Sequence, residues 1–311
     1  MELKQPADNL IGAFVPQPSI MTGYATSEDY TYCRQVMRSA SKNYSFASRF
    51  LPKNKLPHVE ALYALLRVGD DRVDVSHDGF KTPQAAIEDW EQTYWRAFET
   101  ENSPHPVMRA YLDTAINFGI PKETMAPYFR AMKEDLAITR FPTFDHLAYY
   151  MECSALVVGR AMTYILGVEP PYTLQDALSG ADSLSTAMQL SNFWRDIGHD
   201  WSIGRVYLPQ EDMEQFGVSE NDLADRRITP QFIDLLEFQI ERSEHYYEHA
   251  REHIKMLASG QWGVMCGLEI YRAILSSIRR NRYDVFNHRS GANTWQKAGL
   301  VITAYWQTRS L

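Results

Sequence analysis

Cysteine is scarce in this chain, with only three residues among 311 and no C-x-x-C spacing. Cys33, Cys153 and Cys266 lie far apart in the sequence, and their number is odd. These features exclude a disulfide framework and a cysteine-based zinc site, and they are typical of a protein of the reducing cytoplasm. We therefore expect a cytoplasmic protein.

Long apolar runs, a secretory signal and an excess of positive charge are also missing. No run approaches the roughly 18 apolar residues that a membrane span needs, although the protein can still dock peripherally on a membrane. The first 14 residues, MELKQPADNLIGAF, contain no basic region followed by an apolar core, as a signal peptide would. The formal net charge of −8 argues against a nucleic-acid partner. The oligomeric state stays open.

Strand-like alternation is nearly absent, and only residues 205–208 look extended. Apolar stripes at helical spacing, with caps and breakers between them, predict about ten helices. Their expected ranges begin near residue 26 and continue with 57–75, 82–97, 106–118, 122–138, 144–166, a helix from 173, 229–257, 263–287 and 295–309. No linker or internal repeat divides the chain. The sequence predicts a tail over residues 1–25 and one all-α domain over 26–311, a helical bundle with a central cavity.

The most informative stretch is QLSNFWRDIGHDWSIGRVYLP at 189–209. Asn192, Asp196 and Asp200 recur at every fourth position, so they stand on one face of a helix whose other faces are apolar. Carboxylates within such a helix are costly without a counter-charge. Because all the donors are oxygen atoms, Mg²⁺ is favoured over Zn²⁺ as that counter-charge.

A second acidic row lies upstream, where Asp70 and Asp74 are four residues apart and Arg67 precedes them by one turn. Two acidic helix faces can meet across one cavity. Mg²⁺ prefers one or two carboxylates together with substrate phosphates. The two rows therefore predict a site that holds a diphosphate through metal ions.

One competing pattern is His245-Tyr246-Tyr247-Glu248-His249, which matches the H-x-x-E-H arrangement of some zinc proteases. Charged residues interleave with it, so we interpret it as the solvated face of a long helix. Ser39 and Lys42 match S-x-x-K, but the companion motifs of acyl-transfer enzymes are missing.

The two acidic stretches together resemble the squalene/phytoene synthase family of head-to-head isoprenoid synthases. The first is similar to the D-x-x-x-D helix of that family, with Asp70 and Asp74 preceded by Tyr63 and Arg67. The second is similar to its N-x-x-R-D-x-x-x-D stretch and the G-R-x-Y-L-P run that follows. Segments 41–45, 150–159 and 283–286, with Tyr271, resemble further parts of the family pattern. The resemblance covers about residues 30–286.

The resemblance implies a role for each matching residue. Implied catalytic residues are Asp70, Asp74, Asp196, Asp200 and Tyr63. Implied substrate-binding residues are Ser41, Lys42, Asn43, Tyr63, Arg67, Gln189, Arg195, Arg205, Tyr207 and Tyr271. Implied metal ligands are Asp70, Asp74, Asn192, Asp196 and Asp200. The chain departs from the family pattern at Ala40, Asn43, Leu156, Val157 and His199.

For function, the resemblance implies a prenyltransferase that condenses two geranylgeranyl diphosphates to phytoene through a cyclopropyl diphosphate. Mg²⁺ is the expected cofactor, with Mn²⁺ as a substitute. The alternative is a farnesyl diphosphate enzyme that makes dehydrosqualene, squalene or hydroxysqualene, and only squalene requires NADPH. A class I terpene cyclase and a non-enzymatic assembly factor are more distant alternatives.

Overall fold

The computed structural model describes residues 24–75, 77–134 and 138–311, and these residues form helices and no strand. The α-helices are α2 (Ser27–Ala40), α3 (Lys42–Ala47), α4 (Leu56–Asp74), α5 (Pro83–Thr100), α6 (Pro106–Phe118), α7 (Ala126–Glu134), α8 (Phe144–Met151), α9 (Val157–Leu166), α10 (Leu174–Ser202), α11 (Gln210–Phe216), α12 (Glu220–Ala224), α13 (Pro230–His253), α14 (Gln261–Arg280) and α15 (Thr294–Arg309). The predicted all-α fold is confirmed. The tail expected over residues 1–25 lies outside the described residues as far as residue 23.

Several helices begin directly after residues that are good N-terminal caps. The side chains of Thr26, Thr173 and Thr229 each accept a hydrogen bond from a backbone N–H in the first turn of α2, α10 and α13. Such caps satisfy donors that have no partner inside the helix. Gly119 ends α6 in the left-handed conformation, with φ +63°. The long helices could therefore be located from the sequence.

Several predicted helices are shorter than expected or interrupted. The helix expected at 122–138 begins instead as a 3₁₀ turn (Lys122–Met125), which α7 follows, because Pro127 fits only the first turn of a new helix. α14 stops at Arg280 instead of continuing to 287, because Arg282 and Tyr283 adopt positive φ. Sequence analysis predicted no helix at α3, α11 or α12. The extended segment at 205–208 contributes only an isolated bridge between Val206 and Arg140.

A π-helical turn interrupts the long helix expected at 144–166. It covers Glu152–Leu156 and joins α8 to α9. A π-turn inserts one extra residue and changes which side chains face inward, and such turns are frequent at functional sites. Here Ser154 and Ala155 line the internal cavity.

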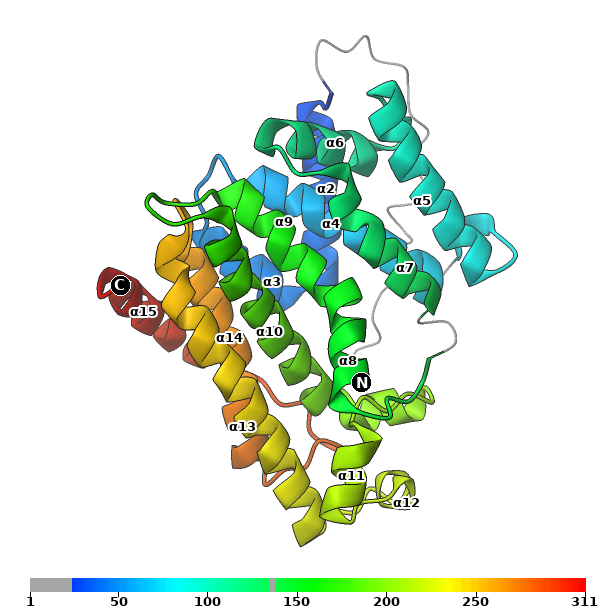
Figure 1. Ribbon diagram of the computed structural model, residues 1–311, viewed down its shortest axis with the longest axis vertical. Helices are drawn as coiled ribbons and strands as arrows, with labels where there is room; N and C mark the ends of the chain where they lie inside the picture. Colours follow the sequence, from blue (N-terminus) through cyan, green and yellow to red (C-terminus); the bar gives the residue numbers. More distant parts are fainter. Residues whose placement is uncertain (1–23, 76, 135–137) are drawn as a thin grey trace.

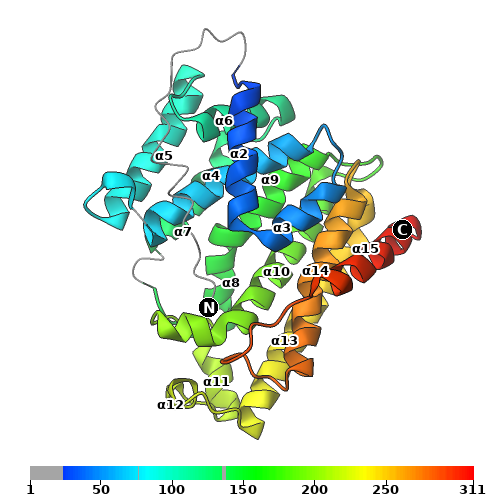
Figure 2. The same cartoon turned by 180° about the vertical axis from the view of Figure 1, so that it is seen from behind.

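The helices enclose a space between two groups of buried apolar residues. One group includes Leu62, Leu65 and Val157 of α4 and α9, and the other includes Leu190 and Ile274 of α10 and α14. Figures 1 and 2 show α10, α13 and α14 running side by side, with α4 and α9 next to them. None of the helices formed by described residues is long and apolar enough to cross a membrane.

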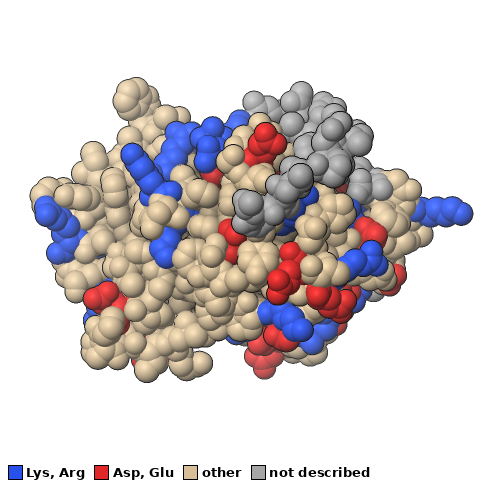
Figure 3. All heavy atoms as spheres, turned by 90° about the horizontal axis from the view of Figure 1, so that it is seen from above, with Lys and Arg blue, Asp and Glu red and all other residues tan. Residues whose placement is uncertain are grey.

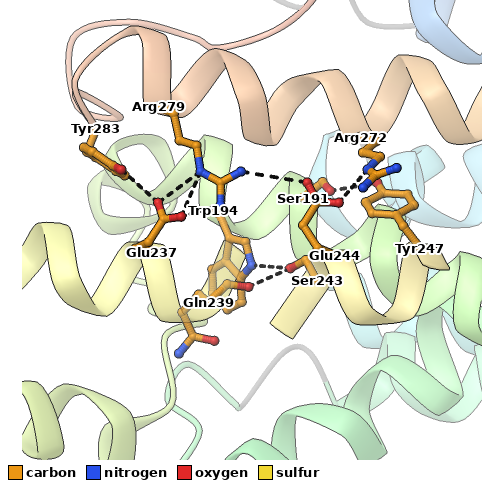
Figure 4. A network of polar contacts seen from close by, with 10 residues as sticks. All are labelled: Ser191, Trp194, Glu237, Gln239, Ser243, Glu244, Tyr247, Arg272, Arg279 and Tyr283. Atoms are coloured by element: carbon orange, nitrogen blue, oxygen red, sulfur yellow. Dashed lines mark hydrogen bonds and ion pairs between the residues drawn. The ribbon is translucent and has the colours of Figure 1, made fainter. Parts of the chain in front are cut away.

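A polar network links α10, α13 and α14 to one another through residues that do not line the cavity (Figure 4). The Trp194 indole N–H donates to Ser243 Oγ at 2.9 Å, and the hydroxyls of Ser191 and Tyr247 lie 2.8 Å apart. Arg272 of α14 donates to Glu244 of α13, at 2.5 Å. Because buried polar groups need partners, these bonds favour one register of the three helices.

Gly159 sets how closely α9 approaches α10. A Cβ atom at this position would lie 2.8 Å from the Ala181 carbonyl oxygen and 2.3 Å from Ser185 Oγ. The first contact is with helix backbone, which cannot rotate away. The two helices must separate if this residue gains a side chain.

We therefore expect Gly159→Ala to lower the free energy of unfolding by about 1–3 kcal/mol, the usual cost of overpacking. Gly299→Ala in α15 is the matched control, because no atom lies within 4 Å of its Cβ position. The control should keep or slightly raise stability through helix propensity. Urea unfolding of both variants measures the difference, and equal stability would contradict the close approach.

Candidate active site

An internal cavity of about 410 Å³ lies between α4, α9, α10, α13 and α14. Its walls are mainly apolar and include Val158, Met162, Leu184, Met188 and Ile254. One end is polar. The side chains there are Tyr63, Arg67, Asp70, Gln189, Asn192 and Tyr271.

Asp70 is the acidic side chain at this polar end. The Tyr128 hydroxyl lies 3.1 Å from Asp70 Oδ1 and donates to the Leu66 carbonyl at 2.7 Å. Burial raises the pKa of Asp70 to about 7, and the charge of Asp74 adds to this, whereas Arg67 opposes it. Arg67 is itself paired with Asp71. The Asp70 carboxylate is thus incompletely compensated and would be stabilised by a further cation.

The second acidic row is compensated by arginines. Asp196 is bonded to its neighbour Arg195 and, at 3.2 Å, to Arg289 from the segment after α14. Burial alone favours the protonated form, but the two guanidinium groups hold the pKa of Asp196 below its usual range. The same two charges act on Tyr271, which lines the cavity. The Asp196 cluster is therefore next to the polar end of the cavity.

The structure brings six of the predicted site residues to the cavity wall and leaves the others outside it. Tyr63, Arg67, Asp70, Gln189, Asn192 and Tyr271 line the cavity. Ser41 caps α3 and is close enough to Tyr63 to form a hydrogen bond. The remaining predicted residues, which do not line it, are Lys42, Asn43, Asp74, Arg195, Asp196, Asp200, Arg205 and Tyr207.

Three of these outer residues have clear local positions. Asp74 is exposed at the last turn of α4. The backbone N–H of Arg205 donates to the Asp200 carbonyl at 2.8 Å, which closes the turn after α10. The Tyr207 ring stacks on Phe193 with centroids 4.0 Å apart. Tyr207 therefore supports α10 from outside the cavity.

Sequence analysis missed two residues that contact the acidic rows. Tyr128 of α7 contacts Asp70 although it lies 58 positions after it in the sequence, and it belongs to no recognised motif. Arg289 reaches Asp196 across 93 positions. One feature of the sequence could have pointed to Arg289. It lies three residues after segment 283–286, which resembles part of the family pattern.

The histidines of the H-x-x-E-H pattern face different surroundings. His249 Nδ1 lies 2.8 Å from Ser183 Oγ, and His253 Nδ1 lies 2.7 Å from the His249 carbonyl oxygen. His245 is exposed, whereas His253 lines the cavity. Neither histidine of the pattern itself, His245 or His249, lines the cavity, whereas His253 one turn further along α13 does.

The donor set at the polar end fits a hard divalent cation. Asp70 and Asn192 offer oxygen atoms from α4 and α10, and the desolvated Asp70 carboxylate gains from added positive charge. Within the described ranges, no three His, Cys, Asp or Glu side chains lie close enough to hold a metal ion by themselves. The arrangement suits an ion that takes its remaining ligands from a bound diphosphate and water, as Mg²⁺ commonly does.

The known proteins that this chain resembles in sequence include phytoene synthases. The squalene/phytoene synthase family model matches residues 37–296. The 15-cis-phytoene synthase of Synechococcus elongatus is 32% identical over 280 residues, which cover 87% of this chain and 90% of that protein. The phytoene synthase of Arthrospira platensis is 30% identical over 308 residues, covering 94% and 98%.

Solved structures are similar over most of the chain. A dehydrosqualene synthase in complex with a ligand superposes with a TM-score of 0.84 at 27% identity, covering 91% of this chain and 98% of that one. A squalene synthase from Alicyclobacillus acidocaldarius gives a TM-score of 0.75 at 28% identity, covering 82% and 95%.

The pairing of Arg289 with Asp196 leads to a prediction about metal affinity. A divalent cation at Asp196 must compete with the guanidinium of Arg289, whose side chain is 71% exposed. Arg289→Gln should therefore strengthen Mn²⁺ binding by roughly two- to fivefold, the size of a partly exposed ion pair. Electron paramagnetic resonance titration of free Mn²⁺ measures this.

Arg96→Gln, an exposed arginine on α5, is the charge-matched control for this titration. It should leave the Mn²⁺ affinity unchanged. An effect of net charge alone would appear in both variants, whereas an effect of competition for Asp196 would appear only in Arg289→Gln. Unchanged or weaker Mn²⁺ binding by Arg289→Gln would show that the arginine does not compete for Asp196.

Proposed function

Because the chain belongs to the squalene/phytoene synthase family of prenyltransferase-type enzymes, we propose that it condenses two geranylgeranyl diphosphates head to head to form phytoene. The observation that carries this proposal is the cavity, which combines a long apolar interior with one end lined by Arg67, Asp70, Gln189 and Asn192. Such a cavity matches a substrate with a hydrocarbon chain and a diphosphate head. The relatives named phytoene synthase support the twenty-carbon substrate.

The chain's own residues bind and orient the diphosphate groups. Arg67, Arg195 and Arg205, with Ser41 and Lys42 near the start of α3, would donate charge-assisted hydrogen bonds to phosphate oxygens. Arg289 joins this set, since it already reaches the Asp196 cluster. Bonds of this kind hold the leaving group in line and favour its departure.

The acidic residues complement these cations. Asp70, Asp74, Asn192, Asp196 and Asp200 would hold Mg²⁺, or Mn²⁺ in its place. When bound, the metal supplies Lewis-acid stabilisation of the negative charge that develops on the leaving diphosphate. The raised pKa of Asp70 is consistent with a carboxylate that is completed by a cation.

The apolar part of the cavity protects the carbocations. The first ionisation releases one diphosphate, and the resulting allylic cation adds to the double bond of the second substrate, with loss of a proton, to give a cyclopropyl diphosphate. The second ionisation releases the other diphosphate, and rearrangement with loss of a second proton gives phytoene. Water must be excluded throughout, and the rings of Tyr44, Tyr63 and Tyr271 offer π-faces to cationic carbon.

This balance needs no reductant, whereas squalene formation needs a hydride from NADPH. The second candidate function is condensation of two farnesyl diphosphates to dehydrosqualene, favoured by the similarity to a dehydrosqualene synthase structure. Phytoene and dehydrosqualene formation differ in substrate chain length alone. α10 borders the cavity from Asn192 to Ala177, which is about 22 Å of helix and provides a long slot.

The first test is turnover by an Asp70 variant. Asp70→Asn keeps the shape of the side chain but removes its charge, so turnover of geranylgeranyl diphosphate with Mg²⁺ should fall by at least about a hundredfold. Mass analysis of the lipid extract should show a forty-carbon hydrocarbon from the unmodified protein without NADPH. Asp225→Asn, at the exposed end of α12, is the matched control and should keep full activity.

Each other outcome of this assay contradicts the proposal in a specific way. A thirty-carbon product from farnesyl diphosphate alone would favour the dehydrosqualene alternative. A cyclic twenty-carbon product would indicate a terpene cyclase, and absence of any product would indicate an assembly factor. Near-normal turnover by Asp70→Asn would remove that residue from the site.

The second test concerns the length of the slot. Ala177 lines the cavity at the end far from Asn192, so Ala177→Phe should shorten the space for the hydrocarbon tail. The ratio of kcat/KM for geranylgeranyl diphosphate to kcat/KM for farnesyl diphosphate should then fall by roughly ten- to hundredfold. The control is Leu174→Phe, an exposed position near the start of the same helix. Competition assays with both substrates measure the ratio, and an unchanged ratio would place the tail elsewhere.

A further inference from the structure

Tyr128 of α7 reaches the helix turn that carries Asp70. Tyr128 is only 2% exposed, and its hydroxyl donates to the Leu66 carbonyl at 2.7 Å and lies 3.1 Å from Asp70 Oδ1. Leu66 and Asp70 are four residues apart, so both acceptors belong to one turn of α4. A phenol has a single hydrogen to donate, and the two acceptors share it in a three-centre arrangement. The hydroxyl therefore fixes the carboxylate relative to the backbone of α4.

Gly69 makes this approach possible. A Cβ atom at position 69 would lie 2.1 Å from the Tyr128 hydroxyl oxygen and 3.1 Å from Trp90 Cδ1. The first distance is far shorter than any van der Waals contact. The hydroxyl thus occupies the space that a side chain at the position before Asp70 would need.

A second buried donor holds the same part of α4. The indole N–H of Trp90, a fully buried residue of α5, donates to the Leu65 carbonyl at 3.1 Å. Both α5 and α7 pack against α4 (Figure 1). Side-chain donors on the consecutive carbonyls of Leu65 and Leu66 restrict the rotation of α4 about its axis. The direction in which Asp70 points is therefore set by α5 and α7.

Asp70 depends on such partners because it lies inside the molecule. Acidic side chains on the outer surface, such as those visible in Figure 3, are in contact with bulk water. Asp70 instead lines the internal cavity, where Tyr128 holds its Oδ1 atom. Its Oδ2 atom has no hydrogen bond or ion pair with another residue of the described ranges. One carboxylate oxygen is thus fixed by the protein, and the other is left for a ligand.

We propose that Tyr128 is a positioning residue for the metal site. Its hydroxyl holds Asp70 Oδ1, which leaves Oδ2 to bind the divalent cation that accompanies the diphosphate. The proposal rests on the proposed function in one respect, the role of Asp70 as a metal ligand. A hydrogen bond to a metal-binding side chain fixes its orientation, and loss of such a bond typically weakens metal binding by roughly 10–100-fold.

Without the hydroxyl, Asp70 would turn toward a different partner. Arg67 lies three residues earlier, on the same face of α4, and also lines the cavity. An ion pair between Arg67 and Asp70 would remove the carboxylate from the metal and the guanidinium from the diphosphate. Tyr128 keeps these two groups apart, and Arg67 pairs with Asp71 instead.

The experiment is a titration of the full-length protein with Mn²⁺, followed by electron paramagnetic resonance of the free ion. Tyr128→Phe should weaken Mn²⁺ binding about tenfold. The matched control is Tyr94→Phe, which removes a buried hydroxyl that donates to the Lys122 carbonyl, also at 2.7 Å, and does not line the cavity. Both variants should lose similar stability in urea unfolding. Only Tyr128→Phe should lose affinity for Mn²⁺.

Two further backgrounds separate positioning from packing. In Asp70→Asn, adding Tyr128→Phe should change the Mn²⁺ affinity by less than about threefold, because the hydroxyl acts through the carboxylate. Gly69→Ala should displace the hydroxyl and lower both stability and Mn²⁺ affinity. Adding Tyr128→Phe to Gly69→Ala removes the clashing oxygen, so it should restore part of the stability and none of the affinity. A purely structural role would restore both.

Turnover gives a second readout. In Tyr128→Phe, the Mg²⁺ concentration that gives half-maximal turnover should rise about tenfold, in line with the loss of metal affinity. Saturating Mg²⁺ should return turnover to within a few-fold of the unmodified protein, because the metal ligands themselves are still present. A loss of turnover that no concentration of Mg²⁺ reverses would contradict positioning.

Other outcomes would also overturn the proposal. If Asp70→Asn loses Mn²⁺ affinity and Tyr128→Phe does not, Tyr128 has no positioning role, and the proposed function is unaffected. If the unmodified protein and Asp70→Asn bind Mn²⁺ equally, Asp70 is not a metal ligand, and the metal site of the proposed function fails together with the role of Tyr128. An equal loss of affinity in Tyr94→Phe would assign the effect to the packing of α5 and α7.

Discussion

The central constraint in this protein is the presence of a carboxylate at one end of an apolar cavity. Burial of Asp70 raises its pKa to about 7, and the nearest arginine, Arg67, is already paired with Asp71. Loss of hydration penalises the charged form unless a cation lies nearby. The polar end of the cavity is therefore electrostatically incomplete, and a metal-bound diphosphate would complete it.

The two acidic rows satisfy this constraint in different ways. Asp196 has two guanidinium partners, Arg195 and Arg289, which lower its pKa, whereas Asp70 has a tyrosine hydroxyl and no arginine of its own. One side of the site is thus supplied with positive charge by the protein, and the other side needs it from a ligand.

Helix packing shapes the remainder of the cavity, whose walls are mainly apolar. Gly159 allows α9 to approach α10 closely, and the π-turn at Glu152–Leu156 directs Ser154 and Ala155 inward. The polar network among α10, α13 and α14 uses other residues, such as Trp194 and Ser243, which do not line the cavity (Figure 4). α15 packs outside this layer and presents indole rings to the surroundings.

The sequence by itself determined the fold class, the main helices and the family. Threonine caps, prolines at helix starts and the four-residue spacing of Asp70, Asp74, Asn192 and Asp196 are local signals, and local signals can be read along the chain. The assigned roles of these residues are still predictions. The substrate-binding role of Tyr207 is implied by the family resemblance alone, and in the structure its ring stacks on Phe193 and does not line the cavity.

Only the tertiary structure decided which side chains meet. Tyr128 reaches Asp70 across 58 positions and Arg289 reaches Asp196 across 93, and no periodic pattern encodes contacts between such distant segments. The interruption at Glu152–Leu156 and the outward direction of Trp295 and Trp306 depend in the same way on which helix faces find a packing partner. Burial is a property of the assembled bundle, and the pKa of Asp70 and the exposure of Trp295 and Trp306 follow from it.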